Sequence, residues 1–308
     1  MKDSHESMTA KICSFARAYH SNYGKEKIFD DYLAYDLMGK DEYEKIGQLI
    51  ERDFDLSRYD PNYSFCRDRI REKMDAFILP IPLSRIAFAE QELARFAAEN
   101  GKCQYVICGA GMDTFAFRNE NPEIQIFELD HPNTQRYKLN RIRALEWNIP
   151  KNVRYVPIDF SKDDMTEQLT ESGFNPSIPA FFSILGVTYY LTLPVFEQTI
   201  EKIGSISALK SKVVFDYPDE TTFQSDGVER VWRLPKITER LGEPMQHGYT
   251  LAEIESALNR HGFLIDRHET PKTIQKRFFE GRSDSQRAFE NIHFILAVKK
   301  GGDMHAEL

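Results

Sequence analysis

Hydrophobic positions in the first hundred residues recur at intervals of three and four, the spacing of a helix with one buried face. The segments TAKICSFARAYHS (9–21) and KIFDDYLAYDLMG (27–39) follow this pattern. The segment SRIAFAEQELARFAAENG (84–101) follows it most clearly, with Ser84 as a cap and Gly101 as the stop. The pattern therefore predicts an N-terminal helical cap over residues 1–101.

After Gly101 the pattern changes to short apolar runs, which are typical of buried strands. Pro132 and Pro194 suit the first turns of helices that lie between these runs. The five runs are QYVIC (104–108), EIQIFEL (123–129), NVRYVPI (152–158), PAFFSIL (179–185) and KVVFDY (212–217). Alternation of strand and helix predicts an α/β fold whose mostly parallel sheet is covered on both faces.

The C-terminal part departs from this alternation. Residues 250–262 read as a helix that opens with a capping box, Thr250 to Glu253. Two strands follow, 263–269 and 291–300, and the 21 residues between them show no clear helical stripe. Parallel strands need a crossover connection, so we expect one of these last two strands to be antiparallel in a seven-stranded sheet.

Residues 218–247 interrupt the chain between the fifth strand and its helix. The segment is polar and contains one amphipathic piece, VERVWRLPKITERLG (228–242). An insertion at the carboxyl end of a strand lies on the ligand side of an open α/β sheet. We therefore interpret it as a lid, with a plain surface excursion as the alternative. The whole chain, 1–308, is expected to form one domain with its core in 102–308.

The composition restricts the class of partner that we expect the chain to bind. Among the 308 residues, 41% are hydrophobic and 29% are charged, an ordinary globular mixture. The net charge of −8 disfavours a general basic face for nucleic acid. The four cysteines form no CxxC pair and no cluster with zinc spacing, so we expect free thiols in the cytoplasm and no metal. The sequence contains no apolar stretch of 18 residues, so no membrane span is expected.

The candidate chemistry begins in VICGAGMDTFAFR (106–118), where an apolar run stops at two glycines. Gly109 and Gly111 let the backbone approach a ligand without an intervening Cβ. The next run ends in IFELD, which offers Glu128 and Asp130. Asp130 lies 21 residues after Gly109, close to the roughly 20 expected for a carboxylate that binds the two ribose hydroxyls. The pair of features predicts a nucleoside site.

The residues after the glycines decide which nucleoside is favoured. A dinucleotide fingerprint has a third small residue at position 114, where this chain has Thr114. Asp113 at the start of a helix would compete with a phosphate for the positive end of the helix dipole. Both departures favour a nucleoside without phosphates, such as S-adenosylmethionine, over the NAD(P) of a dehydrogenase. Asp113 has a simpler alternative role as a helix cap paired with Arg118.

The motifs GAGMDTFAFR (109–118) and FELDHP (127–132) resemble the leucine carboxyl methyltransferase family, whose hallmark is GAGxDTxxxR followed by an acidic pair and a proline. The N-terminal helices and LGVTYYLT (185–192) resemble its bacterial branch, so the resemblance covers nearly the whole chain. It implies a Rossmann-like class I methyltransferase fold and S-adenosyl-L-methionine as cofactor. It also implies O-methylation of a small, polyketide-like molecule of secondary metabolism.

The resemblance further implies a set of cofactor contacts, which lie at strand ends or on the helix before the first strand. They are Arg85, Gly109, Ala110, Gly111, Asp130, Asp159, Phe160 and Leu185.

Each member of this set has an implied role. The glycine turn, 109–111, would line the methionine part, and Arg85 would pair with the cofactor carboxylate. Asp130 would hold the ribose, and Asp159 would accept from the adenine amine with the Phe160 backbone alongside. The alternatives are a solvated helix residue for Arg85 and helix caps for Asp130 and Asp159.

Two positions depart from the family pattern. Ser161 stands where the protein-methylating members have an arginine for the substrate carboxylate, and Leu185 stands where many members have a glutamate. Methylation of a protein C-terminal leucine is therefore not expected, and one cofactor contact is missing or replaced. Lys11 lies near a basic position of the family and is a further candidate.

The methyl acceptor is expected to be a small-molecule carboxylate or hydroxyl. A carboxylate needs no general base, whereas a phenol or enol would benefit from one. Tyr190 and His247 are candidates for that base, although a tyrosine there is more often a pocket wall and a loop histidine is more often solvated. A catalytically silent S-adenosylmethionine-binding protein is the remaining alternative. Expected liners of the mouth are Phe15, Tyr19, Trp232 and Leu234.

Overall fold

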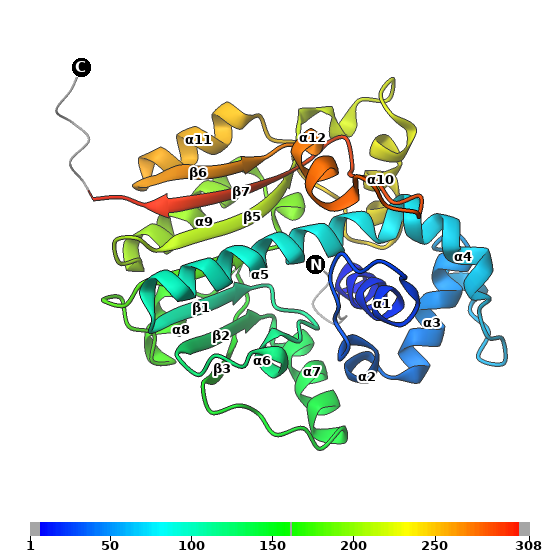
Figure 1. Ribbon diagram of the computed structural model, residues 1–308, viewed down its shortest axis with the longest axis horizontal. Coiled ribbons are helices and arrows are strands. Elements are labelled where there is room, and N and C mark those ends of the chain that lie inside the picture. Colours follow the sequence, from blue (N-terminus) through cyan, green and yellow to red (C-terminus); the bar gives the residue numbers. More distant parts are fainter. Residues whose placement is uncertain (1–6, 161, 302–308) are drawn as a thin grey trace.

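In a computed structural model, which describes residues 7–160 and 162–301, seven strands form one sheet in the order β3-β2-β1-β4-β5-β7-β6 (Figure 1). Neighbours from β3 to β5 pair in parallel, and β7 is antiparallel to both β5 and β6. The predicted fold class and the antiparallel C-terminal strand are thus confirmed. The strands are β1 (Cys103–Cys108), β2 (Ile124–Asp130), β3 (Val153–Pro157), β4 (Ala180–Ile184), β5 (Lys212–Pro218), β6 (Phe263–Glu269) and β7 (Ile292–Lys299).

Both faces of the sheet are covered, because alternate residues of β1 belong to two different apolar cores. Tyr105 and Ile107 pack with α5 (Pro80–Asn100), the long helix that crosses one face in Figure 1. Val106 and Cys108 share the opposite core. The helices of that second core are α8 (Met165–Glu171), α9 (Leu193–Ile206) and α11 (Leu251–Arg260). A strand with period-two alternation and apolar residues on both faces is what a doubly covered sheet requires.

Helix α5 differs from the sequence-based expectation at its start. It begins at Pro80, and the Ser84 hydroxyl donates to the Pro80 carbonyl (2.5 Å) instead of capping the helix. Prolines in the first turn have no N–H to lose, which explains the earlier start. The helix ends before Gly101, as predicted, where φ is +66°. The helix was predicted to belong to the N-terminal cap, but its apolar face packs on the sheet.

The cap has a hydrophobic core of its own, in which Phe15 is fully buried. The cap helices gather at one side of the sheet, near α10 of the insertion (Figure 1). They are α1 (Met8–Tyr23), α2 (Ala34–Met38), α3 (Lys40–Glu51) and α4 (Arg67–Lys73), with the short turns η1 (Leu56–Arg58) and η2 (Met74–Ile78).

The helix predicted over 27–39 is present only in its second half. Residues before α2 fold back on the end of α1, because the Ile28 amide donates to His20 Nε2 (3.0 Å) and Lys27 Nζ donates to the His20 carbonyl (2.6 Å). These tertiary bonds replace the helical hydrogen bonds that the apolar periodicity predicted.

The insertion after β5 contains η4 (Glu220–Phe223) and α10 (Glu229–Arg240), with Pro235 inside the helix. It is tied to the rest of the chain by the buried Arg230. That guanidinium donates to the carbonyls of Ala76 and Ala288 and pairs with Glu290 (2.8 Å). The segment therefore packs on the core at its base instead of extending from it.

The remaining connections are short. Helix α6 (Phe115–Arg118) follows β1, and α7 (Pro132–Ala144) follows β2. Between β6 and β7 the chain forms α12 (Pro271–Ile274) and the turn η5 (Gln275–Phe279), so the expectation of no helix there was wrong. Within the described residues, no helix is long and apolar enough to cross a membrane.

His20 makes cap stability depend on pH. Its ring is fully buried, and burial first, with the charges of Lys27 and Arg282 second, lowers its pKa from 6.5 to about 4. The unfolded chain therefore binds a proton at His20 that the folded chain resists. We expect this group to remove about 2 kcal/mol of unfolding free energy as pH falls from 7 to about 5.

The variant His20→Gln tests this expectation, because its amide oxygen can accept the Ile28 N–H without titrating. Urea unfolding between pH 5 and pH 7 should show a shallower loss of stability in the variant. Parallel pH profiles for the two proteins would exclude His20 as the source.

Candidate functional site

The strand order reverses between β1 and β4, which is where ligands bind in open α/β sheets. Gly109 and Gly111 form the exit of β1 with φ of +77° and +52°, the left-handed region that favours glycine. A Cβ on Gly109 would lie 2.9 Å from Val187 Cγ2, so the exits of β1 and β4 are in close contact. Ala110 between the glycines is buried. The predicted glycine turn thus lies at the reversal point.

Asp130 ends β2 beside this turn. Its carboxylate accepts the amide of Gly111 and the amide of His131 (2.6 Å). Burial raises the pKa of Asp130, and these two amides oppose that rise. A carboxylate has about four lone-pair positions, so two amides leave acceptor capacity for a vicinal diol. The structure therefore brings Gly111 and Asp130 together, as the spacing predicted.

The motif residues after the glycines hold the turn in place. The Asp113 carboxylate accepts the Phe115 amide (2.6 Å) at the start of α6, in keeping with the capping alternative. The suggested pairing of Asp113 with Arg118 was wrong. Arg118 instead makes two bonds to Glu90 (2.9 and 2.5 Å) and donates to the Thr114 hydroxyl (2.8 Å).

A fully buried carboxylate, Asp31, joins the cap to the motif. It accepts the Thr114 hydroxyl (2.6 Å) and pairs with Arg17 (3.3 Å) and Arg118 (3.6 Å). Arg17 also donates to the carbonyl of Met112 (2.7 Å), directly after the glycine turn. Sequence reasoning missed Asp31 and Arg17, because nothing in the local sequence identifies the partners of an isolated charge.

Arg85 lies on α5 and faces the exit of β4. Its Nη1 is 3.1 Å from the carboxylate of Asp216, a fully buried residue of β5. Asp216 also accepts the Gly186 amide (2.7 Å) and the Tyr189 hydroxyl (2.7 Å). Burial and the Asp216 charge raise the pKa of Tyr189, so its hydroxyl remains a donor. Sequence reasoning missed Asp216, although an acid near the end of the apolar run KVVFDY was a usable signal.

The remaining predicted contacts follow β3 and β4. The amide of Ile158 donates to the Asp130 carbonyl (2.8 Å), which places Asp159 at the exit of the strand beside β2. The Asp159 carboxylate pairs with Lys162 (2.8 Å), and Phe160 is 44% exposed. Leu185 follows β4 and packs against the core.

Of the two remaining residues singled out in the sequence, only Lys11 lies in the part of the chain that the structure describes. Lys11 pairs with Glu42 (2.9 Å) on the cap, whereas Ser161 lies outside the described residues.

The two candidate bases lie in different surroundings. Tyr190 ends η3 (Thr188–Tyr190) and is hydrogen-bonded to Thr9, and burial raises the pKa of its hydroxyl. His247 is edge-on to Tyr249 (ring centroids 4.6 Å apart), and its Nε2 lies 3.6 Å from Glu253 in α11. His247 is thus engaged with the start of α11, and Tyr190 lies nearer the cap.

The first turn of α1 is bound to the insertion through Glu243. This carboxylate accepts the Met8 amide (2.6 Å), the Ser7 hydroxyl (3.0 Å) and the Thr9 hydroxyl. A negative charge at a helix N-terminus is stabilised by the helix dipole. A Cβ on Gly111 would lie 3.5 Å from that of Ala10, so α1 covers the glycine turn.

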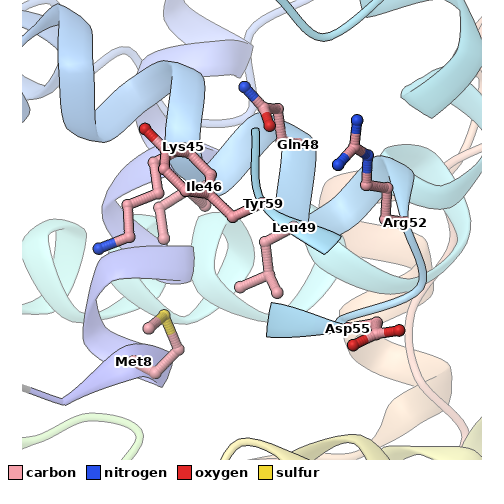
Figure 2. A pocket seen from close by; sticks show the side chains of 8 residues that line it. All are labelled: Met8, Lys45, Ile46, Gln48, Leu49, Arg52, Asp55 and Tyr59. Atoms are coloured by element: carbon pink, nitrogen blue, oxygen red, sulfur yellow. The ribbon is translucent and has the colours of Figure 1, made fainter. Parts of the chain in front are cut away.

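Neither of two cavities in the described part of the chain is lined by the glycine turn, Asp130 or Arg85. One, of about 150 Å³, lies between α1 and α3, with Met8, Ile46 and Leu49 among the residues that line it (Figure 2). The other, of about 330 Å³, lies within the insertion and is lined by Phe223, Trp232, Pro235, Lys236 and Met245 among others. Trp232 therefore lines a cavity of the insertion itself.

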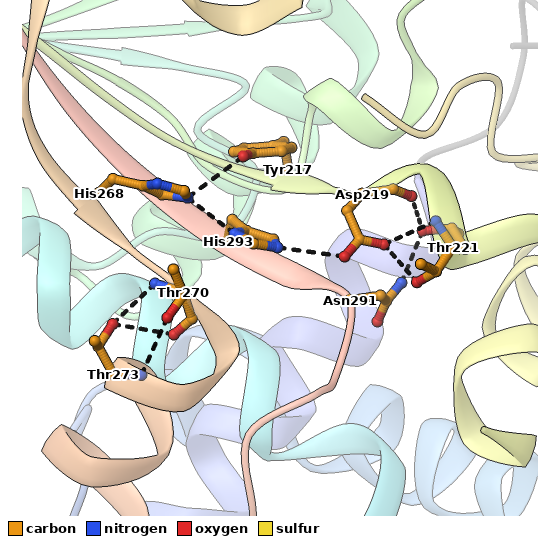
Figure 3. A network of polar contacts seen from close by, with 9 residues as sticks. Tyr217, Asp219, Thr221, His268, Thr270, Thr273, Asn291 and His293 are labelled. Carbon is orange, nitrogen blue, oxygen red and sulfur yellow. Dashed lines mark hydrogen bonds and ion pairs between the residues drawn. The ribbon is translucent and has the colours of Figure 1, made fainter. Parts of the chain in front are cut away.

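A polar network joins the insertion to the β6–β7 pair (Figure 3). His268 Nε2 is 2.9 Å from His293 Nδ1, and His293 Nε2 is 3.3 Å from the Asp219 carboxylate. Asp219 also caps η4 by accepting the Thr221 amide (2.9 Å), and the Tyr217 hydroxyl lies 3.4 Å from His268. Sequence reasoning missed this network, which fixes the first turn of the insertion.

Solved structures share the fold. A DUF574 family protein from Streptomyces avermitilis superposes with a TM-score of 0.55 at 14% identity, covering 92% of this chain and 97% of the other. A methyltransferase-like protein from Thermobifida fusca gives 0.51 at 19% identity, covering 72% and 84%. At these identities the likeness concerns the fold alone.

Sequence relatives go further. A candidate S-adenosyl-L-methionine-dependent methyltransferase of Bacillus subtilis, YktD, is 38% identical over 97% of this chain and 100% of its own length. A similarly named protein of Mycolicibacterium smegmatis is 26% identical over 83% of each chain. The leucine carboxyl methyltransferase profile matches residues 10–204. Together with the glycine turn and Asp130, these matches establish that the chain belongs to the leucine carboxyl methyltransferase family.

Proposed function

We propose that the chain transfers the methyl group of S-adenosyl-L-methionine to an oxygen atom of a small molecule. Membership of the family supports an S-adenosylmethionine-dependent methyltransferase. The acceptor, the atom methylated and the role of each residue are our proposal. The comparisons give no support to the dehydrogenase alternative.

One observation supports the cofactor site above all. The Asp130 carboxylate lies beside the left-handed glycine turn and keeps acceptor capacity free, as a site for ribose hydroxyls needs. The Asp113 carboxylate already accepts the hydrogen bond of the amide at the start of α6. A phosphate bound there would need that amide as a donor. The residues therefore fit a nucleoside without phosphates.

The other contacts are assigned around this point. We assign the 109–111 backbone to the methionine part, Arg85 to the cofactor carboxylate and Asp159 to the adenine amine. Phe160, which is exposed, would lie beside the adenine through its backbone. Leu185 would contribute only an apolar contact. For Asp159, this requires that its pairing with Lys162 opens, which is inexpensive at a half-exposed surface pair.

When bound, S-adenosylmethionine would supply a sulfonium-activated methyl group that an oxygen nucleophile can attack, with S-adenosylhomocysteine as the leaving group. The chain supplies orientation and exclusion of water. Helix α1 covers the glycine turn, and Glu243 fastens its first turn to the insertion. We propose that α1 and the insertion together close over the reactants, so that the insertion acts as a lid.

The surroundings of the candidate bases favour an acceptor that is already ionised. Burial raises the pKa of Tyr190, so its hydroxyl can donate a hydrogen bond but is a poor proton acceptor. His247 is engaged with Glu253. A carboxylate acceptor needs no proton removed, so a small carboxylic acid of secondary metabolism is our first choice and a phenol our second. The four free cysteines accord with the cytoplasmic location that we propose.

Asp130→Asn tests the cofactor site. The variant keeps the shape of the side chain but loses the charge that accepts from two ribose hydroxyls. We expect S-adenosylhomocysteine to bind more weakly by about 1–3 kcal/mol in titration calorimetry.

The matched control is Asp164→Asn, because Asp164 also accepts backbone amides at a helix start but is the N-cap of α8. Its affinity should equal that of the wild type. Equal affinity in Asp130→Asn as well would remove Asp130 from the site.

A screen with methyl-labelled cofactor tests the acceptor. Carboxylic acids, phenols, amines, thiols and peptides are offered in parallel, and the labelled product is treated with mild base. We expect label on a small carboxylic acid, released by base because methyl esters hydrolyse. Transfer confined to amines, thiols or peptides would contradict the proposed acceptor class while leaving the methyltransferase activity intact.

A further inference from the structure

A carboxylate lies beside the position at which many members of the family have a glutamate. Leu185 occupies that position, and the next residue, Gly186, donates its amide to Asp216 Oδ1 (2.7 Å). Asp216 belongs to β5, the strand beside β4, so an acid from the adjacent strand reaches the same exit. Its side chain is 0% exposed.

Three groups surround this carboxylate. The Gly186 amide bonds to one oxygen, and Arg85 and the Tyr189 hydroxyl bond to the other. A buried carboxylate is costly unless it is paired, and an apolar residue on β5 would avoid that cost. A function that requires the charge explains its presence.

Arg85 and Asp216 differ in their exposure to solvent. Arg85 is 14% exposed, whereas Asp216 behind it is fully enclosed. One Arg85 nitrogen bonds to Asp216 and the other approaches Cys13 Sγ at 3.5 Å. Among the described residues, no other acceptor bonds to its guanidinium, so part of its five-donor fork is free for a ligand.

Close packing fixes the direction of that fork. A Cβ on Gly186 would lie 2.7 Å from Arg85 Cζ, so the guanidinium rests directly on the β4 exit. With φ at +71°, Gly186 is also in the left-handed region. The long arginine side chain, which has many rotamers in solution, is thereby held in one orientation by Asp216 and by the bare backbone.

We propose that Asp216 replaces the missing glutamate as a positioning residue, orienting Arg85 and balancing its charge so that the site recognises the zwitterionic methionyl end of the cofactor. The inference rests on the proposed function, because it presumes S-adenosylmethionine as the ligand. An arginine alone would select any anion. An arginine paired with a carboxylate matches a ligand end that carries one positive and one negative charge and is therefore neutral overall.

The test compares two ligands that share adenine, ribose and sulfur. S-Adenosylhomocysteine carries the zwitterionic end, and 5′-methylthioadenosine does not. In Asp216→Asn, we expect the dissociation constant of S-adenosylhomocysteine to rise by about tenfold or more. That of 5′-methylthioadenosine should stay within about twofold, because its contacts do not involve this pair. A merely structural role would weaken both ligands together.

The matched control is Glu92→Gln. Glu92 is also a buried carboxylate beside an arginine, Arg95 (2.6 Å), and it lies on α5 two turns from Arg85. Both ligands should bind this variant as they bind the wild type. A tenfold loss of S-adenosylhomocysteine in Glu92→Gln would overturn the assignment, because any buried carboxylate would then produce it.

A double variant keeps the test valid if either single variant is unstable. Arg85→Gln/Asp216→Asn removes both charges, so no unpaired charge stays buried. It should lose S-adenosylhomocysteine, keep 5′-methylthioadenosine and be no weaker than Arg85→Gln alone, because Asp216 acts through Arg85.

The outcomes separate the two proposals. Unchanged or tighter S-adenosylhomocysteine binding in Asp216→Asn, or equal losses for the two ligands, would overturn the role of Asp216 alone. Absence of binding of either ligand to the wild type would instead overturn the proposed function.

Discussion

The burial of the Asp31 carboxylate is the constraint on which the site depends. A charge without access to water must be paired, and here Arg17, Thr114 and Arg118 meet it. Removing one partner of such a group typically costs about 3–5 kcal/mol. Because Thr114 and Arg118 belong to the glycine motif and Arg17 belongs to α1, the cap can dock only where it covers that motif.

Buried or partly buried carboxylates also hold the other loops at the carboxyl ends of the strands. Three of them hold one loop each: Asp130 the β1 exit, Asp216 the β4 exit and Asp219 the start of the insertion. Glu243 then fastens α1 to the insertion. Elements distant in the sequence are thus joined by charged hydrogen bonds, which are stronger than neutral ones and specific in geometry. This arrangement suits a site that must be ordered around a ligand and closed to water.

The sequence predicted what local chemistry determines. The strands follow from apolar runs, the capping box at Thr250 from its spacing, and the antiparallel β7 from the lack of a clear helical stripe in the connection before it. It could not predict contacts whose partners lie far away. The acid near the end of KVVFDY did not reveal that Asp216 pairs with Arg85, 131 positions earlier, and residues 27–33 are non-helical because of bonds to His20. The contact between the glycine turn and Asp130 was therefore predicted from the sequence, whereas the contacts between distant charges were missed.

We propose that Asp130 and the glycine turn hold the cofactor under α1. In a crystal structure with S-adenosylhomocysteine, we expect both ribose hydroxyls within hydrogen-bonding distance of the Asp130 carboxylate and the methionyl end along residues 109–111. A nucleoside bound instead in the cavity between α1 and α3 or in the cavity of the insertion, with Asp130 bonded only to the amides of Gly111 and His131, would contradict it.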